Sequence, residues 1–243
     1  MDLVSLTYGS LGILAGIVFI VTAIFVYRKD PSYDLNRLIA LSIASLSLLV
    51  INSGVMYILQ TTDPLIMNTL RDLAEIGSLL SAFFVFLGGI QVNYGREWRG
   101  IKYTGPLLIL AIVSMIFMSF EHVGTETING TIFYYFASDV PGGFIFITIV
   151  PLVALVAAIS FFERVRRISR DTLTRRSLGF MELGMGLIMV TAAFLVLILQ
   201  ILIPGEIIPF ESAVFLVIIG QSGYLLASFL LYLAFRSTKE AET

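Results

Sequence analysis

The chain contains no cysteine, and only 13% of its 243 residues are charged. The absence of cysteine excludes disulfide bonds, thiolate chemistry and cysteine-ligated metals. Soluble domains carry about 25% charged residues, so this chain has too few charges to cover an ordinary soluble surface. Hydrophobic residues make up 58% of the chain, and its mean hydropathy is +0.95. The composition therefore favours a membrane protein with several spans.

Groups that carry chemistry are also scarce. His122 is the only histidine, and with Glu121 and Glu126 but no cysteine it forms a poor metal site, so we expect no metal. The sequence contains no HExxH, no phosphate-binding loop and no nucleophile elbow. We therefore predict neither enzyme activity nor a cofactor. A net charge of −2 gives no indication of a nucleic-acid partner.

Seven apolar stretches are long enough to cross a bilayer, which takes about 20 residues in a helix. They cover residues 6–26, 35–59, 65–92, 103–120, 144–170, 178–203 and 209–235, with a polar end on the fifth beyond residue 162. The first stretch has no basic residue before it and is too long for a signal peptide, so we expect an uncleaved span. The predicted fold class is an all-α membrane protein, with residues 1–243 forming one seven-helix transmembrane domain.

The basic residues are distributed very unevenly between the predicted connections. Fourteen of the 15 Lys and Arg residues follow the first, third, fifth or seventh stretch, and Arg71 is the exception. Cytoplasmic connections are enriched in Lys and Arg. We therefore expect a plasma-membrane protein whose N-terminus lies outside and whose C-terminus lies in the cytoplasm.

One connection on the predicted outer side is long, covering about residues 121–143. Asn129-Gly130 lies between two short β-prone runs, and this pair favours a type I′ turn because both residues tolerate a positive φ. We therefore predict a small β-hairpin that forms a lid over the helices. The aromatic run at 133–136 either lies at the membrane interface or covers a pocket.

Polar residues inside the predicted helices indicate a pocket below this lid. Arg71, Asp72 and Glu75 share one helix face, since their spacings are i,i+3 and i,i+4. Charged groups inside a membrane usually face the bundle interior or water. The candidate pocket residues are Asn52, Arg71, Asp72, Glu75, Ser78, Gln221 and Tyr224. The alternative is a self-paired charge cluster at a helix end, together with ordinary hydrogen bonds between helices.

The predicted cytoplasmic side carries one buried acid and one basic segment. Glu182 is an intramembrane charge that could carry a proton or pair with Arg175, Arg176 or Arg96. The basic segment contains Arg164, Arg166, Arg167, Arg170, Arg175 and Arg176. Each basic residue near an anionic membrane surface contributes about 1 kcal/mol. We expect contact with anionic lipids, and the alternative is a docking surface for a cytoplasmic partner.

Seven helices, an outer hairpin and a basic connection before the sixth helix together resemble the receptor plan that microbial rhodopsins share. The only lysines are Lys29, Lys102 and Lys239, so none lies in the seventh helix and a retinal Schiff base is excluded. The arginine-rich stretch at 164–176 is similar to the inner loop in the seven-helix N-terminal sensor region of prokaryotic, including archaeal, histidine kinases. That resemblance implies a stand-alone, receptor-like sensor for signal transduction. Because eight residues follow the last predicted helix, we expect output through a cytoplasmic or membrane partner.

Two other functions remain open. With an offset of 140 residues, Gln60 aligns with Gln200 and Arg96 with Arg236, so the first three helices match the last three. Parallel repeats of this kind occur in small-molecule transporters, here with a 3+1+3 arrangement. The other possibility is a non-catalytic subunit of a membrane complex, in which the polar residues only pack.

Overall fold

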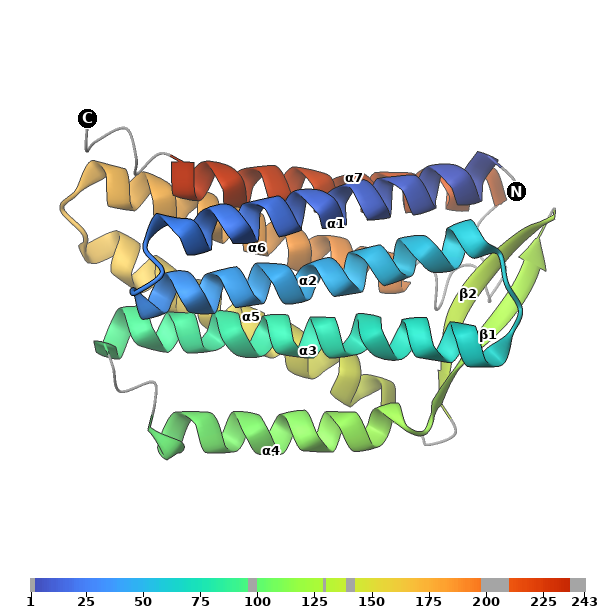
Figure 1. Ribbon diagram of the computed structural model, residues 1–243, viewed down its shortest axis with the longest axis horizontal. Helices are drawn as coiled ribbons and strands as arrows, with labels where there is room; N and C mark the ends of the chain where they lie inside the picture. Colours follow the sequence, from blue (N-terminus) through green and yellow to red (C-terminus); the bar gives the residue numbers. More distant parts are fainter. Residues whose placement is uncertain (1–2, 96–99, 129, 139–142, 198–209, 237–243) are drawn as a thin grey trace.

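The computed structural model describes residues 3–95, 100–128, 130–138, 143–197 and 210–236. Within these ranges the chain forms seven helices and one antiparallel pair of strands (Figure 1). The elements are α1 (Leu3–Lys29), α2 (Asp34–Leu59), α3 (Pro64–Tyr94), α4 (Ile101–Met118), β1 (Glu121–Ile128), β2 (Thr131–Ser138), α5 (Gly143–Ile168), α6 (Thr172–Leu197) and α7 (Phe210–Arg236). The predicted all-α class with a small hairpin is confirmed.

Among the described boundaries, the largest difference from the prediction is at the start of α6, which begins at Thr172 and not at residue 178, while the predicted end at residue 203 lies outside the described residues. Asp171 explains the difference, because its carboxylate accepts hydrogen bonds from the backbone amides of Leu173 and Thr174. A side chain that caps the first free amides allows a polar segment to begin a helix. The apolar pattern alone does not contain this information.

Five of the described helices, α1, α2, α3, α6 and α7, have the length and apolar character needed to cross a membrane. In α4 the apolar part is shorter, Thr104–Met118. Large apolar side chains such as Leu14, Val21 and Ile24 are exposed along α1. Lipid tails are the natural neighbours of such a surface, so the structure supports a membrane protein.

Six helices form a closed ring in which α1, α2, α3, α5, α6 and α7 each pack against the next (Figure 1). The ring closes where α7 packs against α1, and Lys29 donates a hydrogen bond to the carbonyl of Phe235 there. Helix α4 lies outside the ring and packs less extensively against α3 and α5. The connection from α3 to α5 therefore runs around the bundle and not through it.

Glycines let α2 approach both of its neighbours at backbone distance. A Cβ atom added at Gly54 would lie 2.7 Å from the carbonyl oxygen of Gly9 on α1. One added at Gly77 on α3 would lie 2.6 Å from the carbonyl oxygen of Ser45. Small residues at such crossings allow close van der Waals packing where lipid supplies no hydrophobic drive between helices. Helices α1, α2 and α3 thus form a tightly packed unit.

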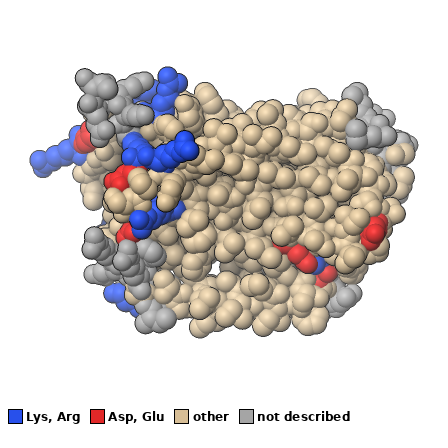
Figure 2. Space-filling model, in the orientation of Figure 1, with Lys and Arg blue, Asp and Glu red and all other residues tan. Residues whose placement is uncertain are grey.

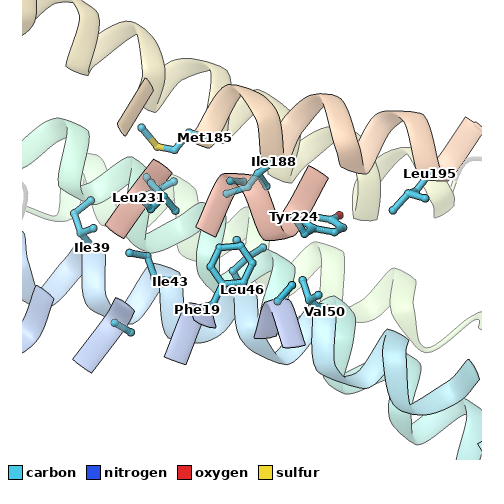
Figure 3. Close-up of a cluster of buried hydrophobic side chains, with 14 of the residues drawn as sticks. Phe19, Ile39, Ile43, Leu46, Val50, Met185, Ile188, Leu195, Tyr224 and Leu231 are labelled. Atoms are coloured by element: carbon cyan, nitrogen blue, oxygen red, sulfur yellow. The ribbon is translucent and has the colours of Figure 1, made fainter. Parts of the chain in front are cut away.

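The interior of the ring is filled by side chains from opposite walls (Figure 3). Phe19 from α1 and Ile43 from α2 face Ile188 from α6 and Leu231 from α7, and all four are buried. Many small dispersion contacts between such side chains add up to a large stabilisation. The core therefore joins the α1–α2 wall to the α6–α7 wall.

The predicted hairpin is present, with Ile128 paired to Thr131 beside the turn and Glu121 paired to Ser138 at the open end. Gly130 has φ +83°, as a turn with left-handed residues requires. Asn129 lies outside the described residues, so the type I′ assignment is tested at Gly130 alone. Strand β1 packs against α3 and β2 against α1, which places the hairpin over one end of the bundle (Figure 1). We call this the hairpin end.

Replacing Gly77 with alanine should force α2 and α3 apart, because the new methyl group meets backbone atoms that cannot rotate away. We expect a loss of about 1–3 kcal/mol in stability, measured by thermal unfolding of the detergent-solubilised protein. The matched control is Gly186→Ala on α6, where an added Cβ has no neighbour within 4 Å. Equal melting temperatures for the two variants would contradict the close-packed crossing.

Candidate functional site: a buried charged cluster under the hairpin

Four charged residues lie together at the hairpin end of the bundle. Arg71, Asp72 and Glu75 come from α3, and Glu121 is the first residue of β1. We call these four residues the charged cluster. Arg71, Glu75 and Glu121 are 3%, 4% and 7% exposed. Charged residues are almost never so deeply buried unless they are paired, so the cluster is the strongest site candidate among the described residues.

The Arg71 guanidinium connects its own helix to the end of α4. Its Nε donates to Oδ1 of Asp72 at 3.0 Å, and its Nη2 donates to the same oxygen. Nη2 also donates to the carbonyl oxygen of Met118, the last residue of α4, at 3.3 Å. Oε1 of Glu75 lies 4.0 Å from Nε. Arg71 therefore holds the end of α4 against α3 through a buried charge.

Glu75 and Glu121 form a carboxyl pair between α3 and β1, with their side chains within hydrogen-bonding reach of each other. Both carboxyl oxygens of Glu75 and Oε1 of Glu121 are buried, and no protein group among the described residues donates a hydrogen bond to them. Burial raises the pKa of Glu121 above its ordinary value, while the hydrogen bond with Glu75 and the charge of Arg71 act in the opposite direction. Two such carboxyl groups can hold a proton or a small cation.

Three further hydrogen bonds dock the hairpin onto the helix ends, and we call them the hairpin latches. The amide of Val123 donates to Oδ1 of Asn68 at 3.1 Å. The amide of Ile132 donates to Oε1 of Gln60 at 3.4 Å. The Tyr134 hydroxyl donates to the carbonyl of Thr61 at 3.2 Å. Burial raises the pKa of Tyr134 to about 12, so it remains a donor at physiological pH.

Gln221 and Tyr224 belong to a second buried group, on the opposite wall of the ring. Gln221 is 1% exposed and hydrogen-bonded to Tyr8 of α1. The Tyr8 ring lies 4.1 Å from that of Tyr57, which in turn stacks edge-on against Tyr134 at 5.2 Å. These distances join ring centroids. The aromatic group thus runs from α7 through α1 and α2 to β2.

A cavity of about 70 Å³ lies in the middle of the bundle, between α2, α3, α5, α6 and α7. Its lining is mostly aliphatic and methionine side chains, with Ser42, Ser78 and Ser81 along one wall and Pro151 on α5. A space of this size can hold a few small molecules or waters. It contains no charged lining residue among those the structure describes.

The residues predicted to form one pocket are therefore found in separate places. Arg71, Asp72 and Glu75 lie under the hairpin, and Gln221 and Tyr224 lie in the aromatic group. Asn52 donates to the carbonyl of Leu48 within its own helix, at 2.7 Å. Of the predicted pocket residues, Ser78 is the one that lines the central cavity.

Sequence reasoning did not select Glu121 as a site residue, although it appeared beside the predicted hairpin. The signal that could have found it is the hairpin itself. If the lid covers the third helix, then the first acidic residue of the lid lies near that helix. The latch residues Gln60 and Asn68 were missed because an amide side chain near a helix end is common and has no distinctive pattern in the sequence.

At the opposite end of the bundle, Glu182 pairs with Arg166, whose Nε lies 3.0 Å from Oε2 of Glu182. Arg175 and Arg176, two of the partners considered from the sequence, form no ion pair with Glu182 among the described residues, and Arg96 lies outside those residues. Helix α5 continues to Ile168, and this places Arg166 beside α6. Arg166 also pairs with Glu163, so these charges link α5 to α6.

The other predicted contact residues of this end lie around the α5–α6 turn. Exposed among them are Arg164, Arg167, Arg170, Arg175 and Arg176. Arg167 pairs with Glu163, and the Arg176 guanidinium lies 5.7 Å from the centre of the Phe180 ring. Figure 2 shows Lys and Arg side chains gathered at this end, which we call the basic end.

Among the described residues, no three His, Cys, Asp or Glu side chains lie in an arrangement that could hold a metal ion. A scan against protein-family models gives no match to the chain, and a search of curated proteins gives no significant match. We therefore infer function from the geometry of the charged cluster, the cavity and the basic end.

Replacing Arg71 with glutamine should destabilise the hairpin end, because Glu75 and Glu121 would keep their burial and lose the guanidinium beside them. We expect a loss of about 3 kcal/mol in unfolding free energy, as for other broken buried ion pairs. The measurement is thermal unfolding in detergent. The matched control is Arg37→Gln, since Arg37 is exposed and its pair with Asp34 spans 3.9 Å. That change should cost at most about 1 kcal/mol. A small, similar effect of both changes would show that the cluster is not structurally important.

Proposed function

We propose that this chain is a multi-pass, receptor-like membrane sensor. In this proposal the hairpin and the N-terminus face outside, and the α5–α6 turn faces the cytoplasm and a signalling partner. The observation that carries the proposal is the charged cluster, because it joins α3 to the hairpin through the buried charges of Glu75 and Glu121. A buried polar connection of this kind responds strongly to a change in any one of its members. Such a connection suits the input site of a sensor.

The distribution of charge supports this orientation. Basic side chains gather at the end formed by the α1–α2 connection, the α5–α6 turn and the end of α7, whereas Arg71 is the one described basic residue at the hairpin end (Figure 2). The positive-inside rule assigns the basic end to the cytoplasm. All seven helices would then cross the plasma membrane, including α4 and α5.

The packing of the bundle supports a route from the cluster to the basic end. Helices α1, α2 and α3 are held together by the glycine contacts, and α5 and α6 share the central cavity with α2, α3 and α7. Helix α3 packs directly on α5, and the Glu163–Arg166–Glu182 network links α5 to α6. A shift at the cluster can therefore displace α5 and α6 together against a rigid α1–α3 unit. Small shifts of packed helices are a common form of switching.

The exposed arginines of the α5–α6 turn suit an acidic partner surface or anionic lipid headgroups. A guanidinium binds carboxylate and phosphate oxygens through pairs of hydrogen bonds. Movement of α5 and α6 would change the spacing of these arginines. The partner would detect that change as a change in affinity.

A small-molecule transporter is the second candidate, and the position of α4 supports it. The ring consists of the three helices before α4 and the three helices after it, with α4 lying outside as a linker would. The central cavity is the natural binding place in that case. Its mostly apolar lining with three serines fits a small, weakly polar substrate.

The orientation can be tested by labelling, because the chain has no cysteine and each introduced thiol is unique. A membrane-impermeant maleimide should modify Thr125→Cys on the hairpin in intact cells. It should modify Arg170→Cys at the α5–α6 turn only after the cells are permeabilised. Thr125 and Arg170 are both exposed, so access to the reagent depends on their side of the membrane. The reverse pattern would refute the orientation.

Transmission can be tested by the distance between spin labels on cysteines introduced at Tyr94, at the end of α3, and at Arg175, on α6. Both positions are exposed at the basic end. Arg71→Gln, at the far end of α3, should shift this distance distribution, whereas Arg37→Gln should leave it unchanged. Identical distributions in all three proteins would refute the sensor proposal. Uptake of a small solute into proteoliposomes with no such shift would favour the transporter.

A further inference from the structure

The four members of the charged cluster do not balance in charge, since one guanidinium faces three carboxyl groups. Asp72 accepts both hydrogen bonds from Nε and Nη2 of Arg71, and it is 47% exposed, so water solvates its remaining lone pairs. Glu75 lies further from the guanidinium, with its Oε1 4.0 Å from Nε of Arg71, and Glu121 interacts with Glu75 across the gap between α3 and β1. The excess negative charge is therefore concentrated on the buried Glu75–Glu121 pair.

An ionised carboxylate has only acceptor oxygens, so two ionised carboxylates cannot hydrogen-bond to each other. Glu75 and Glu121 face each other, and three of their four oxygens are buried without another protein partner. Two carboxyl groups sharing such a site retain one proton between them, because both cannot ionise at close range. A bound proton supplies the missing donor and removes one of the two unbalanced charges.

We propose that the Glu75–Glu121 pair is a proton-binding site that exists only while the hairpin is docked, so that external protons are the stimulus of the sensor. This inference rests on the function proposed above and assigns its ligand. Glu75 belongs to α3 and Glu121 to β1, so undocking the hairpin separates the two carboxyl groups and exposes both to water. Docking therefore takes up a proton, and loss of that proton favours release of the hairpin.

The direction of the pH dependence follows from this uptake. Glu121 has an ordinary pKa when the hairpin is released and a raised pKa when it is docked. Docking is therefore fully favoured below the ordinary carboxyl pKa and is weakened as the pH rises through the raised value. With one proton taken up, the docking equilibrium changes by up to about tenfold for each pH unit in that range.

The charged and titratable groups that face Glu121 come from two elements. Helix α3 contributes Glu75, Arg71 and Asp72, and β1 itself contributes His122. From α4 the Met118 carbonyl reaches the cluster, through Arg71. His122 is exposed and lies next to Glu121 in the chain, so it is the group that the experiment must separate from the carboxyl pair.

The experiment measures hairpin docking in the full-length protein, reconstituted in lipid nanodiscs. Spin labels are placed on cysteines introduced at Thr69 of α3 and Thr125 of β1, which are both exposed. Strong spin–spin coupling reports the docked hairpin. In the otherwise native protein we expect coupling to be strong at low pH and to fall as the pH rises. Coupling that does not change with pH would overturn the proposal.

Three variants identify the responsible group. Glu121→Gln keeps a hydrogen-bond donor toward Glu75 but cannot ionise, so the hairpin should remain docked at high pH. Glu75→Gln should behave in the same way. His122→Gln is the matched control and should keep the full pH response. A response that persists in Glu121→Gln and disappears in His122→Gln would assign the effect to the histidine and overturn the proposal.

Two further measurements separate the remaining outcomes. At a fixed high pH, sodium chloride and choline chloride should give the same extent of hairpin docking. Stronger docking in sodium chloride would overturn the proton assignment in favour of a metal cation. Infrared spectroscopy should show the carbonyl stretch of a protonated carboxyl group in the native protein and its loss in Glu121→Gln. This second readout tests the site without hairpin motion.

The proton assignment and the sensor proposal fail in different ways. If docking ignores pH but Arg71→Gln still shifts the distance between labels at 94 and 175, then only the proton assignment fails. If docking follows pH and that distance never changes, then the proton site stands and the sensor proposal fails.

Discussion

Burial of the Arg71 guanidinium at the end of α3 is the constraint on which the hairpin end of this protein depends. A buried charge is very costly without partners, and the partners come from three directions: Asp72 on the same helix, the Met118 carbonyl at the end of α4, and the Glu75–Glu121 pair shared with β1. Helix α4 packs only lightly on the ring, so this contact is a principal tie between its end and the bundle. Moving the hairpin therefore changes the environment of a charge inside the bundle.

The bundle divides into a tightly packed side and a more adaptable side. Between α1, α2 and α3 the backbones approach so closely at Gly54 and Gly77 that no Cβ atom fits. Helices α5 and α6 pack less extensively on each other, border the central cavity together with α2, α3 and α7, and are joined by the charges of Glu163, Arg166 and Glu182. Close-packed interfaces have few alternative arrangements. In the proposed sensor, a change at the charged cluster would therefore be expressed as a shift of α5 and α6.

Local patterns predicted the elements well because each element depends on its own residues. Helix boundaries follow from apolar length, and the hairpin follows from Asn129-Gly130 between β-prone runs. The error at the start of α6 arose because Asp171 caps a polar turn that the hydropathy pattern does not detect. Arg71, Asp72 and Glu75 were identified because they share a helix face, which is also a local property. Glu121 was missed because its partner lies 46 positions away in the chain, on another element.

By itself the sequence determined that this is a largely helical membrane protein with a hairpin and strongly one-sided basic residues. These properties depend on the solvation of each segment in water or lipid and are nearly independent of neighbouring segments. Only the tertiary structure decided that Glu121 meets Glu75, that Glu182 pairs with Arg166, and that Gln221 lies with the tyrosines and not with the charged cluster. Those pairings depend on helix order, rotation and depth, which are set by packing between distant segments. The charged cluster, first visible as three residues on one helix, is completed by a fourth residue that only the docked hairpin brings to it.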